Sequence, residues 1–286
     1  MSIKKLAIYG SRRQQLHVDE IRRLLRLLVL DGVEVFIHPK FYTHLGELGI
    51  NASGIMPTRD EFPADVDLVL SIGGDGTFLR TAAWVGETSV PILGINTGHL
   101  GYLSAMSFDA LLTGLEDVLE GKFVTESRTL LEVVSPRVKG LRYALNEVAI
   151  AKEDTSSMIS ADTYIDSCQL AEYKADGLIV ATPTGSTAYN LSVGGPIIQP
   201  TAPVWVISPI AAHSLSLRPI VISDDAELKI QVSGRANTFR LSLDGRSTTL
   251  PIDTCVTIKR APYRVEIVQQ PGSEFPEVLQ HKLMFN

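Results

Sequence analysis

The sequence contains few cysteines and no long apolar run. Its 286 residues include two cysteines, Cys168 and Cys255, which are too few for a disulfide framework and favour a reducing compartment. No segment approaches the ~18 consecutive apolar residues of a membrane-spanning helix, and the N-terminus lacks the pattern of a secretory signal. We therefore expect a cytoplasmic protein that does not enter a membrane.

The sequence also lacks an excess of positive charge. It has 26 Lys and Arg against 32 Asp and Glu, so its formal net charge is −6. No broad basic surface for nucleic acid is therefore expected. An anionic ligand would have to be held by local hydrogen-bond donors, because the field of the whole protein opposes it.

Residues 1–105 alternate between strand-like and helix-like segments. Strands are predicted at 5–10, 33–37, 67–72 and 91–96, and helices at 17–32 and 78–86. In the first helix Ile21, Leu24, Leu25 and Leu28 share one face, and Gly32 follows at the position of a C-cap glycine. This alternation predicts an α/β domain with a parallel, doubly wound sheet.

Residues 106–269 have a different pattern. A single helix is predicted over 108–123, and short strands separated by Gly, Pro, Asp and Ser follow. The pattern predicts a second, β-rich domain of the sandwich type. The tail, residues 270–286, has weak helical character, and we expect it to pack back on the first domain.

The segment Gly73-Gly74-Asp75-Gly76-Thr77 lies between a predicted strand and a predicted helix. Glycines let backbone N–H groups approach a phosphate closely, and the N-terminus of a helix favours anions. A carboxylate there needs a reason: it accepts a proton, or it holds a metal ion that bridges to phosphate. Thr77 is placed to cap the helix or to bind a phosphate oxygen. The alternative is an ordinary turn.

Two further segments place polar groups or bare backbone beside apolar strands. In residues 96–104, Gly98 and Gly101 expose the backbone and Tyr102 offers a flat aromatic face; the alternative is an interdomain connection. Asn146 and Glu147 lie inside the apolar strand predicted at 142–153, and their side chains suit a ribose diol. The alternative is an exposed edge position; adjacent strand residues face opposite sides, so both polar groups are awkward unless one lines a site or the backbone bends there.

Residues 174–196 form the stretch richest in potential ligand groups. Asp176 precedes a buried strand, and a loop rich in Ser, Thr and Gly over 182–187 leads to Tyr189. Hydroxyls, free N–H groups and an aromatic face suit an adenine or nicotinamide pocket. A Ser/Thr-rich stretch of this kind is otherwise an ordinary loop.

The order of these motifs, from GGDGT through TPTGSTAY to LSLDG at 241–245, resembles that of bacterial NAD kinases. Lipid kinases and phosphofructokinases share only GGDGT. The resemblance implies an α/β domain followed by a β-rich domain. It also implies ATP-dependent phosphorylation of the adenosine 2′-hydroxyl of NAD, with a divalent metal ion such as Mg²⁺, in a homodimer or homotetramer. The alternatives are a lipid or sugar kinase of the same superfamily and a non-catalytic NAD-binding sensor.

The resemblance assigns the proton acceptor to Asp75 and gives no protein side chain to the metal ion. Together with the motifs, it predicts that the following residues bind nucleotide: Gly74, Asp75, Gly76, Thr77, Arg80, Tyr102, Asn146, Glu147, Lys174, Asp176, Thr187, Ala188, Tyr189, Asn190, Leu191, Ser192 and Arg246. Two of them depart from the family pattern. Asn190 replaces a common serine, and Arg246 stands where an amide side chain is common, where it contacts a phosphate or weakens a ribose contact.

Overall fold

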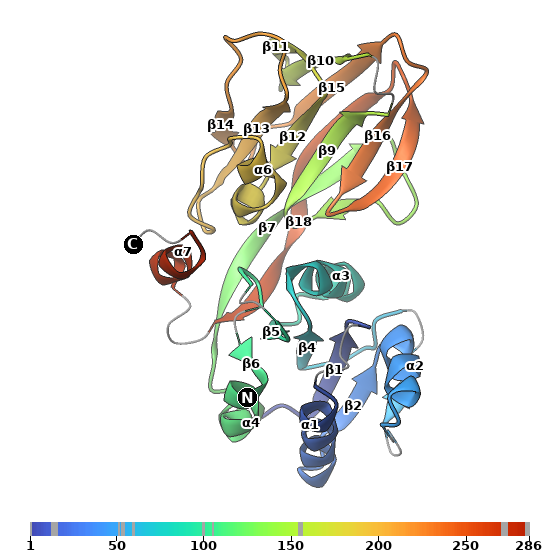
Figure 1. The fold of residues 1–286 in the computed structure, drawn as a ribbon, viewed down its shortest axis with the longest axis vertical. Coiled ribbons are helices and arrows are strands. Elements are labelled where there is room, and N and C mark those ends of the chain that lie inside the picture. The colour runs from blue at the N-terminus through green and yellow to red at the C-terminus, as the bar shows by residue number, and fades with distance from the viewer. Residues whose placement is uncertain are drawn as a thin grey trace. The chain divides into compact units, whose positions relative to one another are not determined.

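The computed structural model describes residues 2–12, 17–50, 52, 55–58, 61–98, 101–104, 106–153, 157–269 and 274–283. Figure 1 shows its helices and strands. The chain forms two compact units, residues 1–127 with 265–286, and residues 128–264. The first unit runs past residue 105 because α4 (Phe108–Thr113) and α5 (Leu115–Leu119) contribute apolar side chains to its core.

The first unit contains a parallel sheet whose strand order is β3-β2-β1-β4-β5. A short strand, β6, also pairs in parallel with β5. The strands are β1 (Lys5–Gly10), β2 (Glu34–Ile37), β3 (Met56–Pro57), β4 (Leu68–Ile72), β5 (Ile92–Asn96) and β6 (Met106–Ser107). The chain proceeds from β1 to β2 and β3 on one side, and then to β4 and β5 on the other. The predicted doubly wound α/β arrangement is confirmed.

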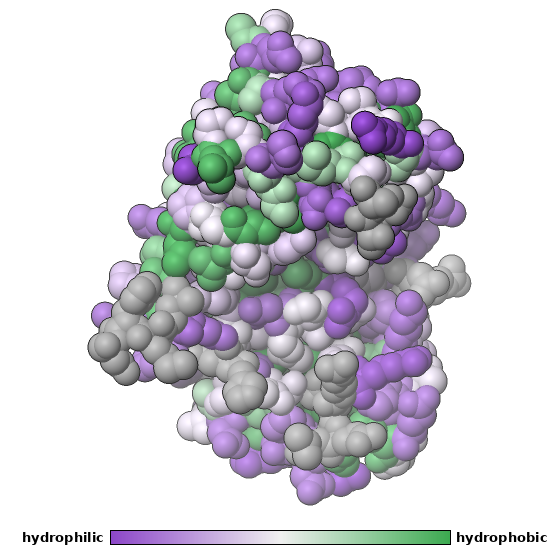
Figure 2. Space-filling view, turned by 45° about the horizontal axis from the view of Figure 1, so that its top comes forward, coloured by the Kyte–Doolittle hydropathy of each residue, from purple (hydrophilic) through white to green (hydrophobic). Residues whose placement is uncertain are grey.

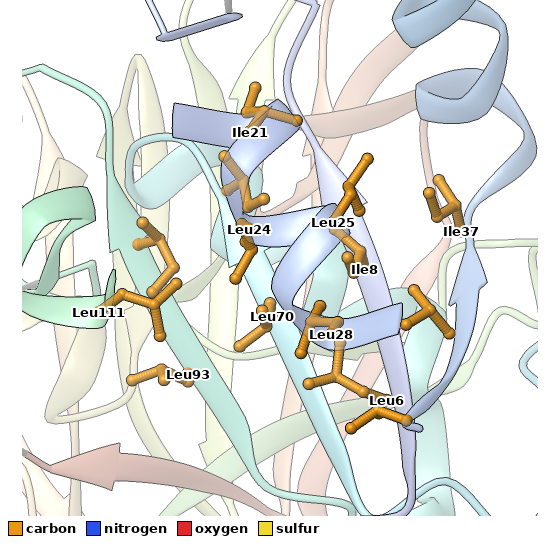
Figure 3. Close-up of a cluster of buried hydrophobic side chains, with 14 of the residues drawn as sticks. Leu6, Ile8, Ile21, Leu24, Leu25, Leu28, Ile37, Leu70, Leu93 and Leu111 are labelled. Atoms are coloured by element: carbon orange, nitrogen blue, oxygen red, sulfur yellow. The ribbon is translucent and has the colours of Figure 1, made fainter. Parts of the chain in front are cut away.

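Helices cover both faces of this sheet. They are α1 (Val18–Leu30), α2 (Pro39–Glu47) and α3 (Asp75–Val85), with a 3₁₀ turn at Gly86–Thr88; α7 (Phe275–Leu283) belongs to the same unit. The buried face of α1 packs against Leu6, Ile8 and Leu70 (Figure 3). On the other face, the hydroxyl of Thr81 in α3 donates to that of Ser71 at 2.8 Å. Successive strand residues point to opposite faces, which explains both contacts.

Two local predictions for the first unit need correction. The predicted helix over 108–123 is two short helices, since Gly114 lies between α4 and α5 and a glycine weakens a helix at that point. Helix α2 was not predicted, although its proline occupies a favoured position near the start of the helix. The expected C-cap glycine of α1 is confirmed, with Gly32 at φ +70°.

The second unit is a sandwich of two sheets. One is antiparallel, in the order β14-β13-β12-β9-β16-β17, and the other contains β11-β10-β15-β18 with β7 and β8 alongside. The strands are β7 (Val124–Ser135), β8 (Tyr143–Ala144), β9 (Glu147–Lys152), β10 (Ile159–Ile165), β11 (Cys168–Ala175), β12 (Gly177–Ala181), β13 (Val204–Ile210), β14 (Ile220–Ser223), β15 (Leu228–Gly234), β16 (Thr238–Leu243), β17 (Arg246–Pro251) and β18 (Cys255–Gln269).

Side chains from both sheets of the second unit form one core. Trp205, Tyr173 and Phe239 are its largest fully buried members. The predicted β-rich, sandwich-like domain is confirmed. The strand predicted over 142–153 is interrupted, because β8 ends at Ala144 and β9 starts at Glu147. The loop expected over 182–187 is also more regular than predicted, with a 3₁₀ helix at Thr184–Thr187 followed by α6 (Tyr189–Ser192).

The surface mixes polar and apolar residues. On the face shown in Figure 2, hydrophobic residues form small groups among hydrophilic ones. Within the described ranges, no helix is both long enough and apolar enough to cross a membrane.

Helix α1 allows a test of how much the core of the first unit contributes to stability. Leu24 is fully buried, whereas Leu30, at the end of the same helix, is 70% exposed. We expect Leu24→Ala to lower the free energy of unfolding by about 2–5 kcal/mol, because it leaves a cavity. Leu30→Ala should change it by less than about 0.5 kcal/mol. Urea denaturation of both variants measures the difference, and equal effects would contradict this packing of α1.

Candidate functional site

The switch point of the parallel sheet lies between β1 and β4, where the direction of strand order reverses. Ligands of doubly wound sheets bind at the carboxyl ends of the strands at such a point. Gly10 ends β1 and Ser11 follows it, and Gly73 and Gly74 follow β4. The Ser11 N–H donates to the Ile72 carbonyl at 2.9 Å, which joins the two strand ends.

The glycine loop leads directly into α3. Gly73 has φ +152°, and a Cβ there would lie 2.4 Å from the Thr77 hydroxyl oxygen, so only glycine fits. Gly74 is the exposed N-cap residue, and the helix starts at Asp75 rather than at residue 78 as expected. Thr77 is buried in the first turn and does not cap the helix; its hydroxyl accepts a hydrogen bond from Arg80 at 3.2 Å. The first N–H groups of α3 therefore follow an exposed glycine that has no side chain to cover them.

The Asp75 carboxylate is held by three successive backbone amides. Oδ2 accepts from the N–H of Tyr102 at 2.9 Å, and Oδ1 accepts from those of Leu103 at 3.0 Å and Ser104 at 3.2 Å. An ionised carboxylate has about four lone-pair positions, so these bonds leave one on Oδ2. The carboxylate is therefore fixed in place and retains one acceptor position.

The segment that binds Asp75 needs its glycine for steric reasons. A Cβ at Gly101 would lie 2.0 Å from Asp75 Oδ1. The ring of the half-buried Tyr102 faces the ammonium of Lys282 in α7, whose nitrogen is 5.3 Å from the ring centre. The phenol oxygen of Tyr102 is buried without a hydrogen-bond partner. Residues 99 and 100 of this motif lie outside the described residues.

In the second unit, Asp244 holds the interruption between β8 and β9. Its carboxylate accepts from the N–H groups of Leu145 at 2.7 Å, Asn146 at 2.8 Å and Glu147 at 3.2 Å. These bonds replace the strand pairing that the bend gives up. A bend, one of the two arrangements that the sequence left open for Asn146 and Glu147, is therefore present.

Asn146 and Glu147 each have a buried side-chain oxygen that could accept a hydrogen bond from a ligand. Among the described residues, Asn146 Oδ1 and Glu147 Oε2 are both buried and have no hydrogen-bond partner. Burial raises the pKa of Glu147 to about 7, and the negative charge of Asp244 adds to this, whereas a backbone hydrogen bond from Tyr189 opposes it. Unpartnered buried acceptors are costly, so this pair is suited to bind a ligand with hydroxyl or N–H donors.

The TPTGSTAY segment is built directly on this bend. The Thr182 hydroxyl donates to the Leu145 carbonyl at 2.6 Å, and the Thr182 N–H donates to the Asn146 carbonyl at 2.9 Å. Gly185 lies so close to the bend that a Cβ would be 2.1 Å from the Asn146 carbonyl oxygen. The two motifs, separate in sequence, form one assembly.

The residues that follow differ in their access to a ligand. Thr187, Ala188 and Leu191 are half-buried, and Tyr189 and Ser192 are exposed. Asn190 is fully buried, and its amide is already bonded: it donates to the Ser186 and Pro196 carbonyls and accepts from the Ser208 hydroxyl at 2.6 Å. In this structure the Asn190 side chain is bonded to protein groups, and its predicted contact with nucleotide stays a prediction.

Lys174 and Asp176 lie away from this assembly. Asp176 adjoins Gly177 at one end of β12, whereas Ala181 at the other end pairs with Glu147, about 13 Å away along the strand. Asp176 forms an ion pair with Lys152 at 2.7 Å, and the exposed Lys174 pairs with Glu172 at 3.2 Å. The structure therefore does not bring these two residues to the Asn146–Glu147 pair.

Arg246 forms hydrogen bonds next to the Asp244 turn. Its guanidinium donates to the carbonyls of Tyr143 at 2.6 Å and Gly140 at 3.3 Å, and lies 3.9 Å from the Asp244 carboxylate. One third of its side chain is exposed. Within the part of the chain that the structure describes, no three His, Cys, Asp or Glu side chains gather as a metal site.

Comparison with known protein families decides among the kinase classes. A family model of the ATP-NAD kinase N-terminal domain matches residues 16–123, and one of its C-terminal domain matches residues 145–270. The NAD kinase of Porphyromonas gingivalis is 42% identical over 283 residues, which cover 99% of this chain and 98% of that protein. The chain belongs to the NAD kinase family. Its reaction is the ATP-dependent phosphorylation of NAD, and the lipid or sugar kinase alternative is set aside.

Other NAD kinases are similar over comparable lengths. The protein of Bacteroides fragilis is 42% identical over 286 residues and 98% of both chains. Two solved structures share the fold at 24% identity. They are yeast NADH kinase complexed with NADH, with a TM-score of 0.87 over 100% of this chain and 89% of that one, and the Archaeoglobus fulgidus NAD kinase in complex with ATP, with a TM-score of 0.76 over 99% and 100%.

Sequence reasoning missed two features of this NAD kinase. The end of β1 was not assigned, although a glycine such as Gly10 at the end of the first strand of a doubly wound sheet signals the switch point. The contacts of Asp244 were also missed, because Asp-Gly between two strands is already typical of a hairpin turn. No sequence signal pairs Asp244 with residues 145–147, which lie almost a hundred positions away.

The contact between Gly101 and Asp75 predicts a specific steric effect. Gly101→Ala should lower the free energy of unfolding by about 1–3 kcal/mol, because the methyl group displaces a carboxylate fixed by three amides. The loss should shrink in the Asp75→Ala background, where the methyl group has room. Gly46→Ala, with nothing within 4 Å of the new methyl group, is the control and should be neutral or stabilising. Thermal denaturation of the four variants tests this, and an unchanged penalty in the double variant would contradict it.

Proposed function

We propose that Asp75 accepts the proton of the adenosine 2′-hydroxyl of NAD while this oxygen takes the γ-phosphoryl group of ATP. The observation that carries the proposal is the geometry of the Asp75 carboxylate, which three amides fix while one acceptor position on Oδ2 stays uncommitted. A carboxylate that only holds backbone, such as Asp244, can keep such a position too. Asp75 differs because it lies in the first turn of α3, where the donor phosphates are proposed to bind and a proton acceptor is needed.

The donor phosphates are proposed to bind at the start of α3. The first N–H groups of this helix follow an exposed Gly74, and the dipole of the helix favours negative charge there. Gly76 and Thr77 belong to the same turn, and Arg80 follows one turn later with an exposed guanidinium. The net negative charge of the protein makes such local donors necessary.

NAD is proposed to bind at the assembly of the second unit. The two unpartnered acceptors, Asn146 Oδ1 and Glu147 Oε2, suit the hydroxyls of a ribose. Residues 187–192 pack beside them with backbone amides and an exposed tyrosine ring. Tyr102 and Arg246 are proposed as further contacts. Lys174 and Asp176 are proposed to contact the nicotinamide end of NAD. An extended dinucleotide is longer than β12, so it can reach from Glu147 at one end of this strand to these two residues at the other.

The proposed step transfers the phosphoryl group directly from ATP to NAD, without a covalent enzyme intermediate. The 2′-oxygen bonds to the γ-phosphorus, the bond from that phosphorus to the β,γ-bridging oxygen breaks, and ADP leaves with the bond electrons. The hydroxyl proton passes to Asp75. A carboxylate is a weak base for an alcohol, so the proton moves late, as the new P–O bond forms.

A divalent metal ion, such as Mg²⁺, is proposed to enter with the triphosphate. The described residues offer no cage of three metal ligands, which fits an ion held mainly by phosphate oxygens and water. Bound in this way, the ion would neutralise phosphate charge. Positioning the two substrates and holding the proton acceptor remain the task of the protein.

Replacing Asp75 tests the proposed role. Asp75→Asn loses at least one of the three amide bonds but keeps the others, so it should still fold and bind NAD. It should lower turnover by about 10²–10⁴-fold, because the proton loses its acceptor. The measurement is NADP formation from NAD, ATP and Mg²⁺, with EDTA as the metal-free arm and product analysis to locate the new phosphate. NAD affinity is measured by calorimetry.

The matched control is Asp67→Asn. Asp67 lies in the same unit, and its Oδ2 accepts from the N–H groups of Lys4 at 2.8 Å and Lys5 at 2.9 Å, so the substitution removes the charge of another amide-bonded carboxylate. It should leave turnover unchanged. Near-normal turnover of Asp75→Asn would refute the assignment of the proton acceptor.

A homodimer or homotetramer is proposed, with the β-rich unit as the interface. Strand β14 is an edge strand of its sheet, and it carries Val221, which is 49% exposed. Exposed edges of this kind serve as pairing surfaces between identical chains. We expect light scattering to show two or four copies of the chain, and Val221→Lys to shift the mass toward one copy. A monomeric wild-type protein at micromolar concentration would contradict the proposal.

A further inference from the structure

Asp244 has the same kind of contact as Asp75 but a different environment. It accepts from three successive backbone amides, as Asp75 does, yet only 4% of its side chain is exposed. The N–H of Asp244 in turn donates to the Glu147 carbonyl at 3.2 Å. The turn between β16 and β17 and the bend before β9 are therefore bonded in both directions.

The turn itself does not require a carboxylate. Asp244 and Gly245 have φ values of +49° and +76° and connect paired residues Leu243 and Arg246, which is the geometry of a two-residue hairpin. Asn-Gly satisfies such a turn as well as Asp-Gly. Only a carboxylate offers acceptors on both oxygens to the amides of residues 145–147. The aspartate therefore serves the bend rather than the turn.

The bend carries the two unpartnered acceptors of the proposed NAD site. Asn146 and Glu147 lie at the last two of the three bonded amides, and each has a buried oxygen with no hydrogen-bond partner. Without an acceptor at Asp244, three amides of the bend lose their partners, and these side chains lose their support. A fixed backbone is what holds a binding pair in a defined place.

Asp244 also affects the charge of Glu147. Burial and the Asp244 carboxylate both raise the pKa of Glu147, and the Tyr189 N–H lowers it. Burial likewise raises the pKa of Asp244, whereas its three amide bonds and the nearby Arg246 guanidinium lower it. These are the groups that act on the pair. The ionised Glu147 accepts hydrogen bonds from ribose hydroxyls, so NAD should bind better as pH rises through the ionisation of Glu147.

We propose that Asp244 is a positioning residue for NAD, because its carboxylate holds the bend that presents Asn146 and Glu147. The inference rests on the proposed NAD site in the second unit. It goes beyond that site because Asp244 need not touch the substrate. It acts through two neighbours on another strand.

The test uses Asp244→Asn in the full chain. The amide nitrogen cannot accept from the backbone, so at least one of the three bonds is lost. We expect KM for NAD to rise about tenfold, KM for ATP to stay the same and kcat to fall less than KM rises. In the wild type, KM for NAD should fall as pH rises through about 7, the pKa of Glu147. In the variant this fall should occur at lower pH, since one negative charge beside Glu147 is gone.

Asp166→Asn is the matched control. Asp166 also has a positive φ, +52°, and its carboxylate accepts from the Glu227 N–H at 3.0 Å in an exposed turn of the same unit. This substitution should leave both KM values and the pH profile unchanged. An equal effect at Asp166 and Asp244 would show that only general turn stability is involved, and would overturn the proposal.

Glu147→Gln separates this inference from the site on which it rests. If Glu147→Gln leaves KM for NAD unchanged, the proposed NAD site fails and the Asp244 inference falls with it. If it raises KM but Asp244→Asn does not, only the Asp244 inference fails. If both raise KM, the double variant should show much less than the product of the two effects. Independent, multiplying effects would overturn the positioning role.

A second substitution decides the matter if Asp244→Asn does not fold. Asp244→Glu keeps the charge but adds a methylene group, so it moves the acceptors relative to the three amides. We expect a raised KM for NAD and a pH profile close to that of the wild type. A normal KM for NAD in this variant would overturn the proposal.

Discussion

A carboxylate that accepts hydrogen bonds from successive backbone amides is the interaction on which both parts of this NAD kinase depend. Where a chain leaves its strand, its N–H groups lose their partners, and buried N–H groups need replacements. Asp75 supplies them for residues 102–104, and Asp244 does so for residues 145–147. Charge-assisted bonds of this kind are stronger than neutral ones, so each holds an irregular segment in one conformation.

The glycines of the motifs complement these carboxylates. Gly101 and Gly185 are surrounded so closely that a methyl group would overlap the Asp75 carboxylate in one case and the backbone of Asn146 in the other. Gly74, by contrast, is open: a Cβ at this position would have nothing within 4 Å, which leaves the first amides of α3 accessible. Glycine thus has two roles here: it permits close packing around Asp75 and the Asn146 bend, and it leaves the start of α3 unobstructed.

Much of the fold could be predicted because its signals are local. The apolar spacing of α1, the strand runs of the parallel sheet and the change to short strands depend on periods of about 3.6 and 2 residues. The broken elements were harder. A single glycine such as Gly114 need not end a helix, and the bend at Asn146 depends on Asp244, which is distant in the chain. Asn190 shows the same limit. Nothing in its motif indicates that its amide is bonded to Ser186, Pro196 and Ser208.

The sequence by itself determined the two-part architecture, the kinase family and the short segments where ligand groups gather, because composition, periodicity and motif order are properties of neighbouring residues. Only the tertiary structure decided which segments meet. In the structure Asp244 is hydrogen-bonded to the Asn146–Glu147 bend, and Gly185 packs against that bend. Lys174 and Asp176 lie near the other end of β12. The physical reason is that hydrogen bonds between distant residues depend on strand register and close packing, which no local pattern encodes.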